Sequence, residues 1–141
     1  MKRVFVDTGG FVALLVAEDE MHPQASTLFE TAARDRWTFV ITNIVVVETY
    51  SVLLARAKDG RRTAISFLDA VEKDQSQGDL TVERVRPDDE FNAIALLRAY
   101  TDKKFSLCDA LSFIVMERLG IREAIAFDRH FGEYGRFTIL H

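Results

Sequence analysis

The sequence predicts an α/β fold in which helices cover both faces of a central, mostly parallel β-sheet. Short runs of β-branched and aromatic residues alternate along the chain with longer stretches of helical periodicity. Only two prolines and seven glycines occur in 141 residues, so long elements without linkers are expected. Strands separated by single or paired helices normally lie parallel in one sheet. We expect residues 1–141 to form a single domain of this class.

Five short runs have the composition of strands. The run LTVERV alternates between apolar and polar residues, as a half-buried strand does. The first and fourth runs are each followed directly by an aspartate. The predicted strands are about residues 3–6 (RVFV), 38–41 (TFVI), 80–85 (LTVERV), 124–127 (AIAF) and 136–140 (RFTIL).

The segments between these strands are predicted to be helices. Pro23 and Pro87 suit the first turn of a helix, and Thr42 or Asn43 suits the N-cap of another. Gly60 is expected to end the helix that begins after this cap. The predicted helices are about residues 9–17, 23–35, 43–58, 61–75, 88–101 and 107–119.

The composition limits the classes of function. The single Cys108 excludes an internal disulfide and a zinc site built from several cysteines, and it suits a reducing cytoplasm. The run VFVDTGGFVALLVA is interrupted by an acid and two glycines, so neither a signal peptide nor a membrane span is expected. The net charge of −4 disfavours unspecific electrostatic binding to nucleic acid or anionic lipid. The three histidines are too scattered to suggest a metal triad.

Asp7 and Asp128 each follow a predicted strand. The triplet Asp7-Thr8-Gly9 also occurs in aspartic proteases, but those enzymes are all-β and this chain is mostly helical. In open α/β sheets, sites form beyond the carboxyl ends of the strands, so the two acids should face one crevice if their strands are neighbours. The alternatives are a turn at Asp7 and a helix N-cap at Asp128.

Glu48 lies within the apolar helical segment NIVVVETYSVLLA, where its neighbours at helical spacing include Val45 and Val52. A carboxylate on an apolar face needs a partner or a metal, because burial of an unpaired charge costs several kcal/mol. An ion pair with an arginine, or exposure at the helix edge, is the alternative. Asp109 has the spacing of a capping box with Ser106, a role that does not exclude metal ligation.

Four converging carboxylates would form a cation site. At roughly 5 Å separation and an effective dielectric near 20, each pair repels by about 3 kcal/mol, so the cluster would take up protons or bind a hard cation. Oxygen ligands favour Mg²⁺ or Mn²⁺, and such sites cleave phosphodiesters. Without these four of the 22 acids, 18 acids balance 18 basic residues.

These motifs resemble the PIN domain of metal-dependent ribonucleases, and in particular the VapC-type toxins of bacterial toxin–antitoxin pairs. The resemblance spans nearly the whole chain. One departure is Ala126, where many members carry Thr or Ser. The matching segments are DTGG at the N-terminus, VVVE ending at Glu48, HPQA at 22–25, SLCDA at 106–110 and FDRHF at 127–131.

The resemblance implies a three-layer PIN-like fold and a Mg²⁺-dependent endoribonuclease in which Mn²⁺ substitutes. It implies Asp7 and Asp109 as principal metal ligands, Glu48 and Asp128 as completing the acidic catalytic site, and hydroxyls lining it from Thr8 and Ser106. It also implies an RNA substrate, a small antitoxin partner, a homodimer, a cytoplasmic location and no membrane association. Close to the site in sequence, the cations expected to contact RNA phosphates are Lys103, Lys104 and Arg129.

Two other functions are compatible with parts of the sequence. An aspartyl-phosphate phosphatase would use the acid after the first strand, but this chemistry usually requires Asp-x-Asp, and here the second position is Gly9. A catalytically silent interaction module would accept a partner's basic side chain in the acidic pocket. Metal-dependent RNA cleavage distinguishes these functions.

Overall fold

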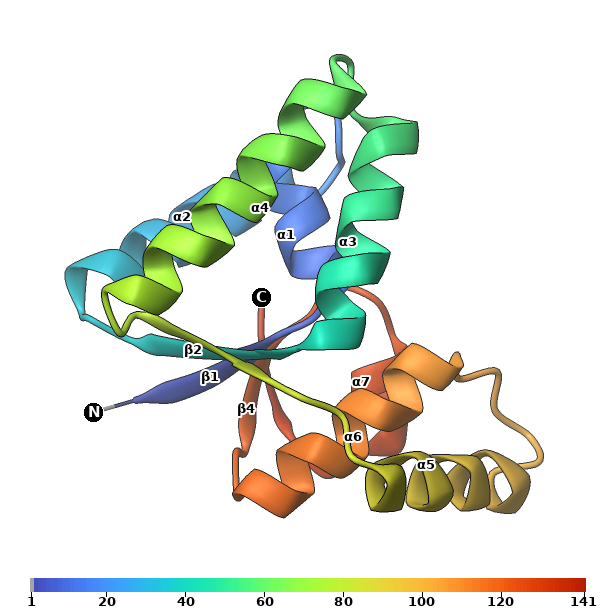
Figure 1. Ribbon diagram of the computed structural model, residues 1–141. Coiled ribbons are helices and arrows are strands. Elements are labelled where there is room, and N and C mark those ends of the chain that lie inside the picture. Colours follow the sequence, from blue (N-terminus) through green and yellow to red (C-terminus); the bar gives the residue numbers. More distant parts are fainter. Residues whose placement is uncertain (1) are drawn as a thin grey trace.

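The computed structural model describes residues 2–141 and confirms the α/β class. Within these residues five strands form one sheet in the order β3-β2-β1-β4-β5, and every neighbouring pair is parallel. The carboxyl ends of the strands therefore lie along one edge of the sheet (Figure 1). The strands are β1 (Arg3–Val6), β2 (Thr38–Thr42), β3 (Leu80–Glu83), β4 (Glu123–Ile125) and β5 (Thr138–Leu140).

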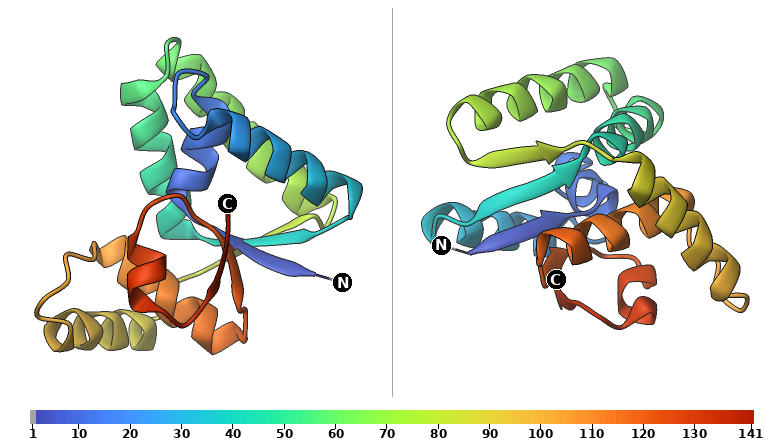
Figure 2. Two further views of the ribbon diagram at one scale, coloured as in Figure 1. Left: turned by 180° about the vertical axis from the view of Figure 1, so that it is seen from behind. Right: turned by 60° about the horizontal axis from the view of Figure 1, so that its bottom comes forward.

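Helices cover both faces of the sheet and give the predicted three layers (Figures 1 and 2). The first four helices lie on one face, where α3 and α4 form a helical hairpin, and the other three lie on the opposite face. Among residues 2–141, no helix combines the length and apolar character needed to cross a membrane. The helices are α1 (Thr8–Leu15), α2 (His22–Arg34), α3 (Asn43–Arg56), α4 (Gly60–Ser76), α5 (Pro87–Ala99), α6 (Leu107–Leu119) and α7 (His130–Tyr134).

The turn between α3 and α4 differs from the prediction. The helix α3 ends at Arg56, and Gly60 is the first residue of α4 rather than the residue that ends α3. A Cβ atom at Gly60 would overlap the backbone carbonyl oxygen of Leu54. The glycine is therefore required by the close approach of the two helices, not by a left-handed cap.

The segment after β4 also differs from the prediction. The strand ends at Ile125 instead of residue 127, and the chain forms the unpredicted helix α7. The side chain of Asp128 accepts a hydrogen bond from the backbone N–H of His130 at 2.8 Å, which favours a turn over an extended strand. Phe131 in this helix is fully buried. Burial of one aromatic side chain thus anchors a helix of only one turn and a half.

The N-terminal caps follow the sequence. Thr42, rather than Asn43, is the N-cap of α3, and its side chain accepts a hydrogen bond from the Val45 N–H at 3.1 Å. At the start of α6, Ser106 accepts from the Asp109 N–H and the Asp109 carboxylate accepts from the Ser106 N–H, both at 2.9 Å. These caps fix the first turns of the two helices that carry Glu48 and Asp109.

An aromatic cluster attaches α7 to α6. The ring of Phe113 stacks on Tyr134 with 4.4 Å between centroids and meets Phe131 edge-on at 4.8 Å. Both phenylalanines are fully buried. The cluster holds the start of α7, and with it Asp128 and His130, beside the first turn of α6.

Candidate active site

The four predicted acids line one cleft of about 460 Å³ beyond the carboxyl ends of β1 and β4. This is the arrangement expected for ligands in an open parallel sheet. They come from four different elements or loops, so the fold, rather than local sequence, brings them together. The cleft is lined by Asp7, Thr8, Gly9, Val12, Asp19, Met21, Glu48, Val52, Arg56, Ser106, Asp109, Phe127, Asp128 and His130.

Asp7 is held between the end of β1 and the start of α1. Its backbone N–H donates to the carbonyl oxygen of Ile125 at 3.0 Å, which continues the contact between β1 and β4 by one residue. At Gly10, a Cβ atom would lie 3.0 Å from the Ile125 side chain and 3.1 Å from Val6. The absence of a side chain at this position lets α1 start directly against the sheet. The strand, the helix and the glycine together fix the Asp7 backbone.

The Asp7 side chain is an unpaired buried acid. The residue is only 2% exposed, and within residues 2–141 no cation forms an ion pair with it. Burial raises the pKa of Asp7 well above its ordinary value of 3.8, and the negative charges of Asp128 and Asp109 raise it further. The protein therefore holds a carboxylate where ionisation is unfavourable without an added cation.

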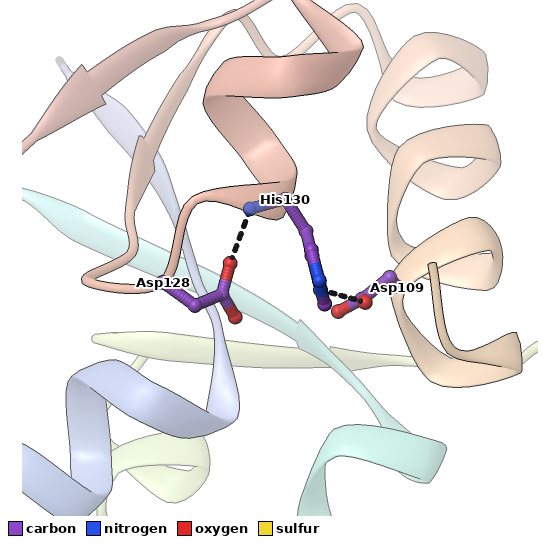
Figure 3. A group of neighbouring side chains, drawn as sticks. All are labelled: Asp109, Asp128 and His130. Atoms are coloured by element: carbon purple, nitrogen blue, oxygen red, sulfur yellow. Dashed lines mark hydrogen bonds and ion pairs between the residues drawn. The ribbon is translucent and has the colours of Figure 1, made fainter. Parts of the chain in front are cut away.

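Asp109 lies in the first turn of α6 and is buried. Its Oδ2 atom accepts the capping hydrogen bond from Ser106 and lies 2.7 Å from Nδ1 of His130. Asp128 is exposed at the mouth of the cleft. Ligand atoms of Asp109, Asp128 and His130 lie within 4.8 Å of one another (Figure 3). Capping and a position in the cleft thus coexist at Asp109, as the sequence predicted.

Glu48 projects from α3 into the same cleft and is half-buried. Burial raises the pKa of the neighbouring Cys108 thiol, and the charges of Glu48, Asp7 and Asp109 raise it further. Glu48 is therefore close enough to this thiol for its charge to act on it. Within the described part of the chain, no arginine pairs with Glu48, so the ion-pair alternative is not observed. Cys108 remains a protonated, buried side chain.

The predicted hydroxyl residues also lie at the cleft. Thr8 is buried beside Asp7, and its Oγ1 accepts a hydrogen bond from the Thr49 hydroxyl at 3.4 Å. Ser106 is exposed and lines the cleft next to Asp109. Both positions can contribute polar contacts to a bound molecule, Thr8 from the floor and Ser106 from the rim.

The three basic residues expected near the substrate do not line the cleft. Lys103 and Arg129 both pair with Glu133 of α7, at 3.8 and 3.3 Å. Lys104 is exposed and forms no ion pair among residues 2–141. The arginine that does line the cleft is Arg56 at the end of α3.

Sequence reasoning missed two residues at the site, Arg56 and His130. Arg56 is about two helical turns after Glu48, a spacing that could have placed it near the same face, and it pairs with Asp19 at 3.1 Å. His130 follows Asp128 by two residues, the spacing of a side-chain-to-backbone turn. The contact of its ring with Asp109 is tertiary and has no signal in the local sequence.

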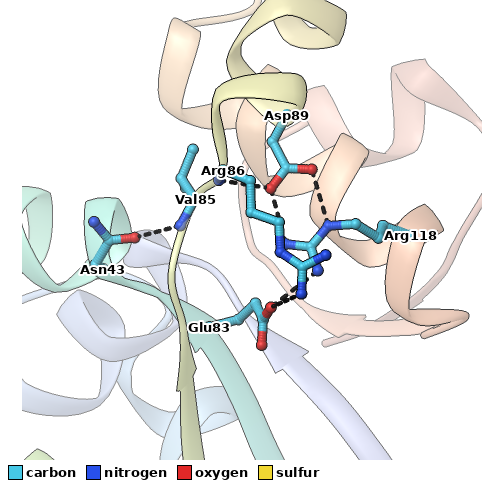
Figure 4. A network of polar contacts seen from close by, with 6 residues as sticks. All are labelled: Asn43, Glu83, Val85, Arg86, Asp89 and Arg118. Carbon is cyan, nitrogen blue, oxygen red and sulfur yellow. Dashed lines mark hydrogen bonds and ion pairs between the residues drawn. The ribbon is translucent and has the colours of Figure 1, made fainter.

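A second buried aspartate gives a contrast with Asp7. Asp89 is also 2% exposed, but Arg118 donates to both of its carboxylate oxygens, at 2.9 and 2.8 Å, and also to Glu83 (Figure 4). Burial raises the pKa of Asp89, but hydrogen bonds from Arg118 and Arg86 outweigh this effect and hold the pKa below 3.8. Asp89 is thus a structural acid that joins α5, α6 and β3.

The donor set of the cleft fits a divalent cation. Asp7, Glu48, Asp109 and Asp128 line the same cleft, and the most buried of them lacks a positive partner in the described chain. Oxygen-rich clusters of this kind suit Mg²⁺ or Mn²⁺ better than softer metals. The arrangement can therefore hold a cation beside a bound phosphate.

Comparisons with known proteins agree with this geometry. A family model described as the PIN domain matches residues 4–136. The "23S rRNA-specific endonuclease VapC20" from two strains of Mycobacterium tuberculosis is 33% identical over 132 residues, which cover 94% of each chain. The crystal structure of M. tuberculosis VapC20, described as a "Sarcin-Ricin loop cleaving toxin", matches with a TM-score of 0.82, 30% identity and coverage of 94% of this chain and 95% of that one.

A more distant structure shares the fold. The Rickettsia felis VapBC2 complex bound to a DNA fragment from its promoter matches with a TM-score of 0.67 and 15% identity, over 97% of this chain and 96% of that one. The family match covers nearly all of the chain, and the relative at 33% identity is similar over the same extent. The chain therefore belongs to the PIN-domain family.

Proposed function

We propose that this chain is a Mg²⁺-dependent endoribonuclease and the toxin of a type II toxin–antitoxin pair. The observation that carries the proposal is the cleft in which buried, unpaired Asp7 faces three further carboxylates. In the reaction, water adds to the phosphorus of an RNA phosphodiester and the bond to one ribose oxygen breaks. The family supports nuclease chemistry, and the similar VapC20 is named for cleavage of 23S rRNA.

The four acids are assigned to cation binding. Asp7 and Asp109 are the principal ligands, because both are buried and their backbones are fixed by β1 and by the α6 capping box. Glu48 from α3 and Asp128 from the segment after β4 complete the set. When bound, Mg²⁺, or Mn²⁺ in its place, supplies Lewis-acid stabilisation of the negative charge that builds on the phosphate. The chain positions these oxygens before the substrate arrives.

Binding of the RNA phosphates is assigned to one basic side chain inside the cleft and to others around it. Arg56 lines the cleft and is half exposed, so its guanidinium can exchange Asp19 for a phosphate. Lys104 is exposed beside the first turn of α6. Lys103 and Arg129 are also assigned to the RNA backbone, at greater cost because both must leave Glu133. The chain has a net charge of −4 and no overall basic character, so a few basic side chains near the cleft would bind the RNA backbone.

The two alternative functions are not favoured. A phosphatase of the aspartyl-phosphate type lacks its second acid, because Gly9 stands two residues after Asp7. A silent module would need no similarity to a nuclease, whereas the chain is 33% identical over 94% of its length to a named endonuclease.

We also propose that the protein is a cytoplasmic homodimer that binds a small antitoxin. Large apolar side chains are exposed on the surface, with Phe91 at 74% and Val47 at 64%, and burial of such side chains between subunits is favourable. Size-exclusion chromatography with light scattering tests the dimer. An adjacent gene for a small DNA-binding protein, and its copurification, test the antitoxin. The exposed apolar side chains are Leu15, Val47, Leu54, Phe91, Ile94 and Leu107.

RNA cleavage by the purified protein tests the enzymatic proposal. Ribosomes containing 23S rRNA are the first substrate, and an unrelated messenger RNA is the comparison. Cleavage should require Mg²⁺, stop with chelator and resume when Mg²⁺ or Mn²⁺ is restored. An Asp109→Asn protein purified identically controls for contaminating nuclease. Cleavage that persists in this control or in chelator contradicts the proposal.

A further inference from the structure

His130 makes a hydrogen bond to each of two acids in the cleft (Figure 3). Its backbone N–H donates to Oδ1 of Asp128 at 2.8 Å. Its ring nitrogen Nδ1 lies 2.7 Å from Oδ2 of Asp109, which is 21 residues earlier in the chain. A single residue at the start of α7 therefore connects a side chain of α6 with the acid that follows β4.

The contacts of Asp109 differ between its two carboxylate oxygens. We assign the donated proton to Nδ1 of His130, with the carboxylate oxygen as the acceptor. The same Oδ2 atom also accepts from the Ser106 backbone N–H at 2.9 Å. Within residues 2–141, Oδ1 of Asp109 accepts no hydrogen bond. One oxygen is thus used by two protein donors, and the other is left for a ligand in the cleft.

The imidazole ring is itself held in place. It meets the buried Phe105 ring in a T-shaped contact, with 5.8 Å between centroids and an interplanar angle of 77°. Its backbone is fixed by the Asp128 turn and by the burial of Phe131 next to it. A donor with little rotational freedom limits the rotation of the carboxylate that accepts from it.

We propose that His130 is a positioning residue, which fixes the Asp109 carboxylate so that Oδ1 is directed to the cation, and which ties Asp128 to the same site. This inference rests on the proposed metal-dependent function. The alternative is that His130 itself binds the metal, since its ring nitrogen and the two acids lie within 4.8 Å of one another. While Nδ1 donates to Asp109 it has no lone pair for a metal, so direct ligation would require Nε2.

Two substitutions separate the hydrogen bond from the ring. In His130→Asn, an amide N–H is bonded to Cγ, as Nδ1 is in histidine, but the contact with Phe105 is lost. In His130→Phe, the aromatic contact is kept and the donor is lost. Both variants retain the backbone N–H that binds Asp128. The measurement is the Mg²⁺ dissociation constant of the RNA-free protein by calorimetry, with kcat for RNA cleavage as a second readout.

We expect His130→Phe to weaken Mg²⁺ binding by at least about tenfold, as is typical when a hydrogen-bond partner of a metal ligand is removed. His130→Asn should stay within about threefold of the parent, and in an Asp109→Asn background His130→Phe should cause no further loss. His130→Gln carries its amide one bond farther out and should behave like His130→Phe, which provides a second test if the latter does not fold.

Three outcomes overturn the inference. If His130→Asn and His130→Phe weaken Mg²⁺ binding equally, His130 acts through ring packing or direct ligation. If His130→Phe and His130→Gln leave Mg²⁺ binding unchanged, His130 has no role in the site. In the Mn²⁺-loaded parent, spin-echo spectroscopy that detects a directly bonded imidazole nitrogen makes His130 a ligand. A parent that neither binds Mg²⁺ nor cleaves RNA contradicts the proposed function instead, and is recognised before any variant is compared.

Discussion

Replacement of Asp7 by asparagine should stabilise the metal-free protein. The carboxylate is 2% exposed, has no cationic partner within residues 2–141 and is repelled by Asp128 and Asp109. Two unit negative charges about 5 Å apart repel by about 3 kcal/mol at an effective dielectric near 20, and the exposure of Asp128 and proton uptake make the repulsion at Asp7 smaller than this. Asparagine keeps the shape and removes the charge. We expect a gain of about 2 kcal/mol, or about 6 °C in Tm for a domain of this size.

Calorimetry with and without Mg²⁺ measures this effect. Without metal, near neutral pH, Asp7→Asn should melt above the parent. At a hundredfold excess over its Kd, Mg²⁺ should raise the free energy of unfolding of the parent by about 2.7 kcal/mol, and its Tm accordingly. The Tm of the variant should rise much less. A variant that melts below the parent without metal refutes the argument from repulsion. Equal Mg²⁺ shifts for both proteins remove Asp7 from the metal site.

Three other predictions concern single residues. Asp109→Asn should lower kcat for Mg²⁺-dependent RNA cleavage at least about 100-fold, or about 2.7 kcal/mol in the barrier, in single-turnover assays with the folded variant. Arg56→Gln should weaken RNA binding and reduce its salt dependence by about one unit of slope without abolishing turnover, as measured by titration at several salt concentrations; an unchanged slope excludes a phosphate contact. Asp89→Asn should cost about 3 kcal/mol near neutral pH because it leaves Arg118 without its principal partner. The pKa of Asp89 is below 3.8 in the folded protein, so its contribution is present above that pH and is lost as pH falls through the folded pKa. Melting curves in acid should therefore be less pH-dependent for Asp89→Asn than for the parent.

The fold, and the position of Asp7 and Asp128 at one edge of the sheet, were predictable from the sequence for the same physical reason. Apolar runs that end at Asp7 and near Asp128 mark strand ends, and parallel strands bring their carboxyl ends to one edge. Glu48 was detectable because a charge on an apolar helical face requires an explanation. These signals are local in the chain, and the topology that combines them follows from the alternation of strands and helices.

The features that sequence analysis missed depend on tertiary contacts. Helix α7 is too short to show helical periodicity, and it is held by the burial of Phe131 and by the stacking of Tyr134 on Phe113. The contact of His130 with Asp109 exists only because that cluster places α7 beside α6. Arg56 was not among the predicted site residues, because its spacing from Glu48 alone does not show that α3 ends at the cleft.

Two buried aspartates in the molecule differ in how their negative charge is balanced. Asp7 and Asp89 are equally buried, yet the pKa of Asp89 is lowered by Arg118 while the pKa of Asp7 is raised by burial and by two negative neighbours. The chain can therefore supply an arginine to a buried acid and does so at Asp89. An acid left without one, at the carboxyl end of a central strand and facing other acids, is retained at a cost in stability. The opposite signs predicted for Asp7→Asn and Asp89→Asn follow from this difference, and in the proposed function a bound cation is the partner that removes the cost at Asp7.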